Sequence, residues 1–406
     1  RLDRNRRFGS AASMDVQPVR AQRPAEIRAL GGARALPPLV LVLFHYHEGH
    51  GYQHLPWFDI PVAKGYLWVE FFFALSGFVL IHVYGRRVDA LWTRKGYFEF
   101  LVNRLARLYP VHLAMLLVLL AHYTITGLIA AHGGFVAGHQ PHVYQPNMTP
   151  ITFLANLLLV QAWNLFHSLS WNTVAWFVSV EFFLCLIFPL YAWMATGGPL
   201  RAVLLIFLGF AALHRMAQVS GHGLDITYDY GLVRGMADFA VGVGLAMLYR
   251  DARARTDKLP ETAFTAAQAA IALWFVYAMY HTGWSHNLLD FWIVPPMTLF
   301  ILTIAFDRGL LSRAFQFKPL RTLGEWSFAI YMGQTLWLSL LHNVENTFYP
   351  NPAPAWDRTI HWLEPAVLVA LSILWGWVLY RTVESPANSA IRAWFRGVKA
   401  RDTRAA

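Results

Sequence analysis

Apolar segments long enough to cross a lipid bilayer recur along almost the whole chain, and they restrict the fold more than any other feature. A membrane-spanning helix needs about 20 consecutive, mostly apolar residues. Charged residues make up only 14% of the chain, whereas soluble domains carry roughly 25%, so too few charges remain to cover a soluble surface. The sequence therefore predicts an all-α fold, a polytopic membrane helix bundle.

We expect about ten transmembrane helices, with both termini in the cytoplasm. Their expected ranges are 35–50, 67–84, 106–128, 173–195, 200–217, 231–249, 264–281, 289–306, 326–343 and 362–382. The segment 151–164 is shorter, and we expect it to form an interfacial or re-entrant helix on the outer side. These ranges divide the chain into a basic cytoplasmic tail (1–33), a transmembrane domain (34–386) and a second basic cytoplasmic tail (387–406).

The distribution of Lys and Arg supports this topology, because cytoplasmic loops of membrane proteins carry an excess of these residues. With ten spans and a cytoplasmic N-terminus, all but four of the 33 Lys and Arg fall on the cytoplasmic side. The exceptions are Lys64, Arg215, Arg234 and Arg358. The net charge of +10 therefore reflects topology and attraction to anionic membrane lipids, and we expect no nucleic-acid partner.

The cysteine content and the N-terminal segment narrow the class of protein further. The single cysteine, Cys185, lies in an apolar segment, which excludes a disulfide framework and a zinc site with several cysteines. The first 30 residues are basic and polar and lack the apolar core of a signal peptide, so we expect no cleaved signal there.

The first predicted span combines an arginine with a histidine, Arg34 and His45. Eleven residues make about three helical turns, so we expect both side chains on one helix face, roughly 16 Å apart along the axis. Ionisable residues at membrane depth are costly and are often functional. Taken singly, Arg34 can also be a residue that reaches back to the cytoplasmic boundary, and His45 an ordinary interfacial histidine.

Polar and small residues of the second span extend this pattern. Glu70 lies at its outer end, where it can face His45 or be an ordinary interfacial carboxylate. Ser76 and Gly77 form a small pair in mid-span, and such pairs permit close helix packing. We favour packing for Gly77 more than for Ser76.

Two arginines precede the third span in the sequence VNRLARLYP. Arg104 and Arg107 are three residues apart and therefore lie on one helix face. Two guanidinium groups on one face suit phosphate groups. Ordinary anchoring of a cytoplasmic loop explains either arginine equally well when it is taken alone.

The ordered set of motifs resembles the integral-membrane acyltransferase-3 family, which acylates sugars and lipids of the bacterial envelope. The matching blocks are R-x10-H at 34–45, FFALSGF at 72–78, R-x2-R-x2-P at 104–110, WFVSVEFFLCLIFP at 176–189, LGEWSFAIYMGQTLW at 323–337 and V-E-x-P at 383–386. They follow one another in the family's order along nearly the whole chain.

The resemblance implies transfer of an acyl group, expected to be acetyl, from cytoplasmic acyl-CoA to a hydroxyl of an envelope sugar or glycolipid. It also implies a multi-pass protein of the bacterial inner membrane. A donor held by its phosphates at Arg34, Arg104 and Arg107 would extend its pantetheine arm into the bundle. The distance from Arg34 to His45 is comparable with the reach of that arm.

His45 is the predicted general base, since a histidine can gain and lose a proton near neutral pH. Glu70 is predicted to hold its other ring nitrogen and to stabilise the imidazolium, as the acid does in a catalytic triad. Glu48, three residues after His45, is a competing partner on the same helix. A covalent acyl-histidine intermediate is an alternative to base catalysis.

Three further residues are predicted to contact the substrate: Ser76, Trp176 and Glu181. Glu181 is buried in mid-span, so a structural ion pair with Arg234 is an alternative for it. The sequence also departs from the family pattern. Gln334 stands where a histidine is common, which weakens a catalytic role for that position, and Phe177 stands where a serine is usual, which we interpret as a packing change.

Two other classes of function remain as alternatives. A transporter or flippase of a glycan or lipid precursor would use Glu181, Arg215 and Arg234 as a polar pathway, although no inverted repeat supports it. An inactive scaffold would need neither Arg34 nor His45. Consumption of a thioester by the purified protein separates an enzyme from both.

A metal site is the last alternative, because imidazole suits zinc and copper. His45, His47, His50 and His54 are close in sequence, but their spacing fits no single helix face. We therefore expect no metal.

Overall fold

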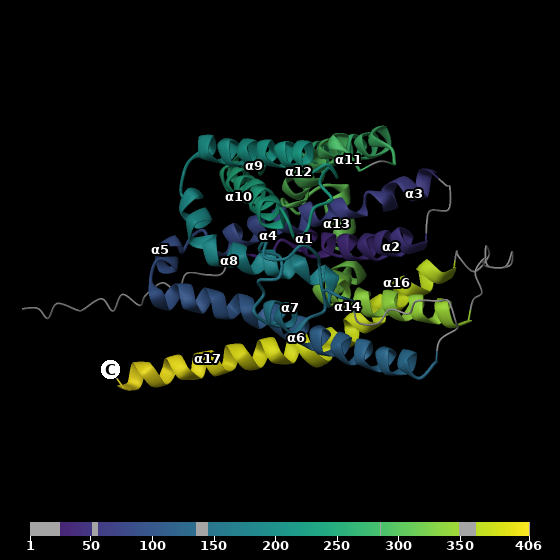
Figure 1. Ribbon diagram of the computed structural model, residues 1–406. Helices are drawn as coiled ribbons and strands as arrows, with labels where there is room; N and C mark the ends of the chain where they lie inside the picture. Colours follow the sequence, from purple (N-terminus) through teal and green to yellow (C-terminus); the bar gives the residue numbers. More distant parts are fainter. Residues whose placement is uncertain (1–24, 51–55, 135–144, 285, 349–362, 406) are drawn as a thin grey trace, which may run out of the picture.

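The computed structural model describes residues 25–50, 56–134, 145–284, 286–348 and 363–405. Within these ranges all regular secondary structure is helical, which confirms the predicted all-α bundle. Most of the long helices run roughly side by side (Figure 1). Most of the predicted N-terminal tail, Arg358 and His54 lie outside the described residues.

The elements follow one another along the chain without a second domain in the described part. They are α1 (Arg28–Ala33), α2 (Leu36–His50), α3 (Pro56–Ala63), η1 (Gly65–Leu67), α4 (Trp68–Tyr84), α5 (Val88–Leu91), α6 (Arg94–Ala131), α7 (Pro150–Leu157), η2 (Thr173–Ala175), α8 (Trp176–Met194), α9 (Pro199–Val219), α10 (Gly231–Thr256), α11 (Glu261–Thr282), η3 (Leu288–Ile293), α12 (Val294–Ile304), α13 (Leu310–Phe315), α14 (Lys318–Phe348), α16 (Leu363–Leu379), the π-helical turn η4 (Tyr380–Glu384) and α17 (Ser385–Ala405).

Eight stretches of the described chain are long and apolar enough to cross a membrane. One of them combines α1 with α2, and another combines α16 with the first part of α17. The spans predicted at 289–306 and 326–343 coincide with η3–α12, which is shorter, and with α14, which carries more polar residues. Each predicted span therefore has a helix, whereas the count of ten and the cytoplasmic termini remain predictions.

The third predicted span is longer than the apolar pattern suggested. The helix α6 begins at Arg94 and runs without a break through Pro110, so Arg104 and Arg107 lie inside it rather than in a loop before it. Proline is tolerated within membrane helices because neighbouring groups satisfy the freed carbonyl. The two arginines are therefore fixed on a rigid element.

The predicted short helix before α8 is present as α7, which is eight residues long. Thr149 caps its first turn by accepting a hydrogen bond from the backbone N–H of Thr152. In Figure 1, α7 lies between α6 and α8, and side chains from the middle of α6, Tyr109 and His112, bond to its backbone. These contacts place α7 against α6, and its interfacial or re-entrant position stays a prediction.

The helices α2, α6 and α14 run in the same direction. The backbones of Gly31 and Gly324 touch, so the chain enters α2 beside the beginning of α14. Further along, the Nε2 of His122 on α6 lies 2.8 Å from the hydroxyl of Ser339 on α14. A side chain at Gly324 would collide with the neighbouring backbone, so glycine is required for this close approach.

The helices α4 and α8 run in the opposite direction. The segment before α4 touches the later part of α2, where Gly65 packs on Phe44. The later part of α8 packs on the earlier part of α6, where Phe188 and Phe100 stack with ring centroids 4.8 Å apart. The bundle interior is therefore lined by helices of both directions.

The bundle has two chemically different ends. We call the end near Arg34, Arg104 and Arg107 the arginine end, and the end near His45 and Tyr66 the histidine end. Because Lys and Arg concentrate on cytoplasmic segments, the arginine end is the predicted cytoplasmic side.

Candidate active site

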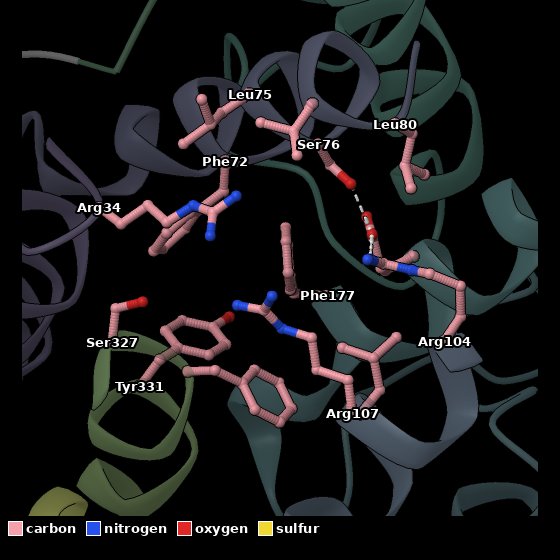
Figure 2. A pocket seen from close by; sticks show the side chains of 14 residues that line it. Arg34, Phe72, Leu75, Ser76, Leu80, Arg104, Arg107, Phe177, Ser327 and Tyr331 are labelled. Atoms are coloured by element: carbon pink, nitrogen blue, oxygen red, sulfur yellow. Dashed lines mark hydrogen bonds and ion pairs between the residues drawn. The ribbon is translucent and has the colours of Figure 1, made fainter. Parts of the chain in front are cut away.

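A cavity of about 100 Å³ opens between α4, α6, α8 and α14, beside the turn that joins α1 to α2 (Figure 2). The polar side chains that line it are Arg34, Ser76, Arg104, Arg107, Glu181 and Ser327, together with the hydroxyl-bearing Tyr331. The structure thus brings together all three predicted donor-binding arginines and two of the three predicted substrate-binding residues. Their roles remain predictions.

Arg34 stands in the turn between α1 and α2, and two contacts hold α1 in place. The carboxylate of Asp307 accepts hydrogen bonds from the backbone N–H groups of Arg28 and Ala29, at 3.0 and 2.7 Å. Gly32 packs directly on the backbone of Phe315. Asp307 therefore caps the start of α1 and Phe315 fixes its side. These contacts orient Arg34 toward the cavity.

Arg104 is tied to its surroundings. Its Nη2 lies 2.6 Å from Oε1 of Glu181, and the hydroxyl of Ser76 donates to the same oxygen at 2.6 Å (Figure 2). Charge-assisted hydrogen bonds of this kind are short and strong. The three residues form one wall of the cavity, and Glu181 neutralises Arg104.

Arg34 and Arg107 differ from Arg104 in making no direct ion pair, although the charge of Glu384 acts on Arg107. In the part of the chain that the structure describes, neither guanidinium group makes a hydrogen bond or an ion pair with a protein side chain. Both extend toward the cavity interior in Figure 2. Two unpaired cations in one partly buried cavity repel each other, and an anion bound between them would relieve that repulsion.

Three aromatic rings, those of Phe72, Phe177 and Tyr331, close the cavity toward the histidine end. On α4, α8 and α14 respectively, each is the lining residue nearest to that end. Ring centroids are 5.7 Å apart for Phe72–Phe177 and Phe177–Tyr331, and 6.2 Å apart for Phe72–Tyr331. The Tyr331 hydroxyl donates to the carbonyl of Val174 at 2.8 Å. We call these three residues the aromatic barrier.

A second cavity, of about 200 Å³, adjoins the first because Arg34 and Arg107 line both. It is more polar, and Arg321, Glu384 and Arg392 also line it. Arg321 makes only a long ion pair, 3.4 Å, to an exposed glutamate. The two cavities therefore meet at Arg34 and Arg107, and the second is lined by the carboxylates of Glu26, Glu325 and Glu384 as well as by arginines.

His45 lies outside both cavities, at the histidine end. Its Nδ1 is 3.0 Å from Oε2 of Glu48, and the two side chains are 29% and 46% exposed. Glu48, the alternative partner considered from the sequence, is therefore the residue that holds the His45 ring. Nδ1 is engaged, so Nε2 is the nitrogen left for a substrate.

Arg234 is the centre of a closed polar network below the histidine end. Its Nε and Nη2 donate to the two carboxylate oxygens of Glu70, at 2.9 and 2.8 Å, and both side chains are almost fully buried. It also donates to the carbonyls of Ile226 and Tyr66, at 2.7 and 3.1 Å. Bidentate geometry with extra backbone bonds is what a buried ion pair needs to offset desolvation.

This network corrects two predicted contacts. Glu70 does not hold His45, because Arg234 takes both of its oxygens. Glu181 does not pair with Arg234, because it faces Arg104. Trp176, the third predicted substrate-binding residue, lies under Arg234, whose guanidinium carbon is 5.5 Å from the ring centroid. Trp176 does not line the first cavity.

Comparison with known proteins identifies the family of the chain. A family model described as an acyltransferase domain matches residues 27–381. The chain belongs to the acyltransferase-3 family. In this membrane acyltransferase the matched range includes the first cavity, the aromatic barrier and His45, whereas Glu384 and Arg392 of the second cavity lie beyond it.

Two known proteins are similar in sequence to the acyltransferase. "Acyltransferase MdmB" of Streptomyces mycarofaciens is 26% identical over 345 residues, covering 79% of this chain and 80% of the relative. "Protein 2 in picA locus" of Rhizobium radiobacter is 30% identical over 165 residues, covering 37% of this chain and 81% of the relative. No solved structure gave a significant match.

The structure shows the contacts of the two residues that depart from the family pattern, Gln334 and Phe177. Gln334 is fully buried, and its side-chain amide donates to the carbonyl of Tyr331 on its own helix at 3.0 Å. An amide cannot act as a base, and Gln334 does not line the first cavity. Phe177 does more than pack, because its ring is part of the aromatic barrier.

Sequence reasoning did not assign Arg321, Glu384 or Arg392 to the site. Glu384 belongs to the V-E-x-P block, and the π-helical turn η4 carries it into the second cavity. That block was the available signal, and π-helical turns occur frequently at functional sites. Nothing in the sequence near Arg321 or Arg392 points to the cavity.

Proposed function

We propose that the acyltransferase takes its acyl group from acyl-CoA bound at the arginine end and transfers it to a hydroxyl at the histidine end. The observation that carries this proposal is the pair of unpaired guanidinium groups, Arg34 and Arg107, in the wall shared by both cavities. The phosphates of coenzyme A supply the missing anions, since guanidinium groups bind phosphate through paired, planar hydrogen bonds.

The donor must extend from the arginines to His45. Arg34 lies in the turn before α2, and the nine-residue step from Leu36 to His45 adds roughly 14 Å of helix at about 1.5 Å per residue. An extended pantetheine arm follows that path through the interior, between α2, α4 and α14. The aromatic barrier crosses the path, so its rings must move aside when the donor threads through.

His45 is the base of the proposed reaction. Its Nε2 accepts the proton of the acceptor hydroxyl as the oxygen bonds to the thioester carbonyl carbon. The tetrahedral intermediate then expels the sulfur, which takes the proton from the imidazolium and leaves as free coenzyme A. Glu48 at Nδ1 holds the ring orientation and balances the transient positive charge.

The remaining features of the proposal follow family membership. Acetyl is the expected acyl group, and the expected acceptor is a hydroxyl of an envelope or extracellular sugar or of a lipid-linked sugar. The expected location is the bacterial inner membrane, with membrane lipids around the bundle. Neither a metal nor a nucleic acid takes part in this scheme.

The geometry gives little support to a transporter. Arg234 is sealed by Glu70 and by backbone carbonyls, and Arg215 is exposed and lies 3.3 Å from Gln218 on its own helix. Glu181 is held by Arg104 and Ser76. These polar residues belong to separate local networks.

Sealed membrane vesicles of both orientations, given radiolabelled acetyl-CoA on the outside, test the proposal. We expect label in envelope glycans only when the cytoplasmic face meets the donor. His45→Ala should lower the initial rate by about 10²- to 10⁴-fold, the usual contribution of a positioned acid–base group. The matched control is His132→Ala, an exposed histidine at the end of α6. Incorporation that does not depend on His45 would contradict its role, and no incorporation in either orientation would contradict the donor.

A further inference from the structure

The histidine end contains a second histidine–carboxylate pair that the proposed function does not use. His286 lies between α11 and η3, Asp225 lies between α9 and α10, and His286 Nδ1 is 3.2 Å from Asp225 Oδ2. Each side chain is 30% exposed. Because Nδ1 faces Asp225, Nε2 is the nitrogen available to another molecule, and no described side chain bonds to it.

His286 and His45 border the same place. The ring of Phe44 lies 5.1 Å from that of His45 and 6.4 Å from that of His286, measured between centroids. The ring of Tyr66 lies 4.5 Å from that of His286. The charge of Asp225 also acts on His45. Two imidazoles, each held by its own carboxylate, thus flank Phe44.

The segment that carries His286 is held firmly. Asp290 pairs with Lys64 at 2.6 Å, with both side chains fully buried, and it accepts a hydrogen bond from the Tyr66 hydroxyl. Gly223 has φ of +63°, and a side chain there would meet the backbone of Asn287 at 2.7 Å. Glycine therefore permits the two loops to approach each other, which fixes Asp225 against His286.

The charges around His286 favour its protonated form. The hydrogen bond to Asp225 raises the pKa of His286 above its ordinary value, and partial burial opposes that effect only in part. Burial works against ionisation of Asp225, but its hydrogen bond with His286 holds its pKa below the ordinary value. The charged and titratable groups that face the pair are Lys64, Tyr66, Glu70, Asp290, Arg234 and His45.

We propose that His286, held by Asp225, is a second catalytic histidine, whose Nε2–H donates a hydrogen bond to the oxyanion formed when the acceptor hydroxyl attacks the thioester. This inference rests on the proposed acyl transfer. His45 moves the proton from the hydroxyl to the departing sulfur, and His286 keeps its own proton throughout. Only the carbonyl C–O bond order changes under His286, so the step balances without another reactant.

Inside-out vesicles containing native envelope glycans, supplied with labelled acetyl-CoA, provide the test. Removal of an oxyanion donor costs about 10²- to 10³-fold in rate, and we expect that loss for His286→Ala. His286→Gln keeps an N–H near the position of Nε2, so it should retain part of the rate. The control is His281→Gln, an exposed histidine of α11 stacked on Tyr277, whose rate should equal that of the wild type.

The pH profile separates a catalytic from a structural role. A raised pKa means that His286 stays charged above the pH at which free histidine loses its proton, and activity falls as pH rises through the folded-state value. Asp225→Asn removes the stabilising charge and should shift this alkaline limb to lower pH. His286→Gln cannot titrate, so the limb should disappear.

The outcomes are distinguishable. If the wild type transfers the label and His286→Ala transfers it at the same rate, this inference alone is overturned. The same holds if the alkaline limb of the pH profile is unchanged in His286→Gln. Absence of transfer in the wild type overturns it together with the proposed function. If His286→Ala fails to elute as a monodisperse protein in detergent, His286→Gln and Asp225→Asn decide the question through their pH profiles.

Discussion

The two ends of the bundle differ in how their charged side chains are paired. At the arginine end, Arg34 and Arg107 have no ion-pair partner in the described chain, although both line the interior. At the histidine end four ion pairs have N···O distances between 2.6 and 3.2 Å. These pairs are Lys64–Asp290, Arg234–Glu70, His286–Asp225 and His45–Glu48.

This difference separates binding from chemistry. An unpaired buried cation destabilises the empty protein, and the cost is recovered when an anion binds. A paired and oriented group is fixed before the substrate arrives, and preorganisation of that kind lowers the barrier of a reaction. The arginine end is therefore suited to hold an anionic donor, and the histidine end is suited to act on it.

The largest expected effect comes from breaking a closed pair. Arg234→Met leaves Glu70 buried without a partner, and loss of one member of a buried pair costs about 3–5 kcal/mol of stability. Thermal unfolding in detergent measures this. The double variant Arg234→Met, Glu70→Leu should recover most of the loss, because neither member of the pair is left without the other. Equal melting temperatures for Arg234→Met and for the double variant would contradict the role of this pair.

The next effect concerns the unpaired arginines. Arg34→Gln and Arg107→Gln each remove a charge-assisted hydrogen bond worth about 1.5–3 kcal/mol, so KM for acetyl-CoA should rise roughly 10- to 100-fold in each case. The stability should stay the same or increase, since repulsion is removed. The control is Arg215→Gln, which changes an exposed arginine outside both cavities. A KM unchanged by either substitution would remove these residues from the donor site.

The aromatic barrier is expected to have a smaller effect that sharpens the boundary between the ends. Phe177→Leu widens the constriction, so the rate with butyryl-CoA relative to acetyl-CoA should rise about tenfold, in the range that one or two methylene groups contribute to discrimination. Phe188→Leu on the same helix is the control, because Phe188 stacks on Phe100 and does not line the cavity. An unchanged ratio would show that the barrier does not limit the acyl chain.

The smallest expected effect concerns the partner of His45. Exposed ion pairs contribute about 0.2–1 kcal/mol, so Glu48→Gln should lower the transfer rate only about two- to fivefold. Initial rates in the vesicle assay measure this, with the exposed Asp89→Asn as control. A loss as large as that of His45→Ala would mean that Glu48 takes part in proton transfer itself.

The sequence predicted the helices and the arginine end well, for physical reasons. Long apolar runs have few alternatives to a membrane helix, and the spacing of Arg104 and Arg107 fixes their common face whatever the neighbouring helices do. Arg34 and His45 also belong to one short segment. Features that depend on local spacing are readable from one sequence.

The tertiary pairs were not readable in this way. The partner of Glu70 lies 164 residues away, and the rotation of α4 about its axis, which no local pattern reports, decides whether Glu70 meets His45 or Arg234. Asp225 and His286 lie in two loops without periodicity. Their meeting depends on the close approach at Gly223, which appears only when the bundle is assembled.

The Arg234–Glu70 pair also has a consequence for biogenesis. A ribosome adding roughly 5–20 residues per second needs about 8–33 seconds to make the 164 residues between the two partners. During that interval α4 carries a carboxyl group in its first turn whose partner has not yet been made, and an ionisable group within a membrane segment is costly without a partner. The helices α4 and α10 therefore cannot complete their packing until both have been synthesised. We expect α4 to stay beside the insertion machinery, or to carry a proton, until α10 emerges and locks it in place.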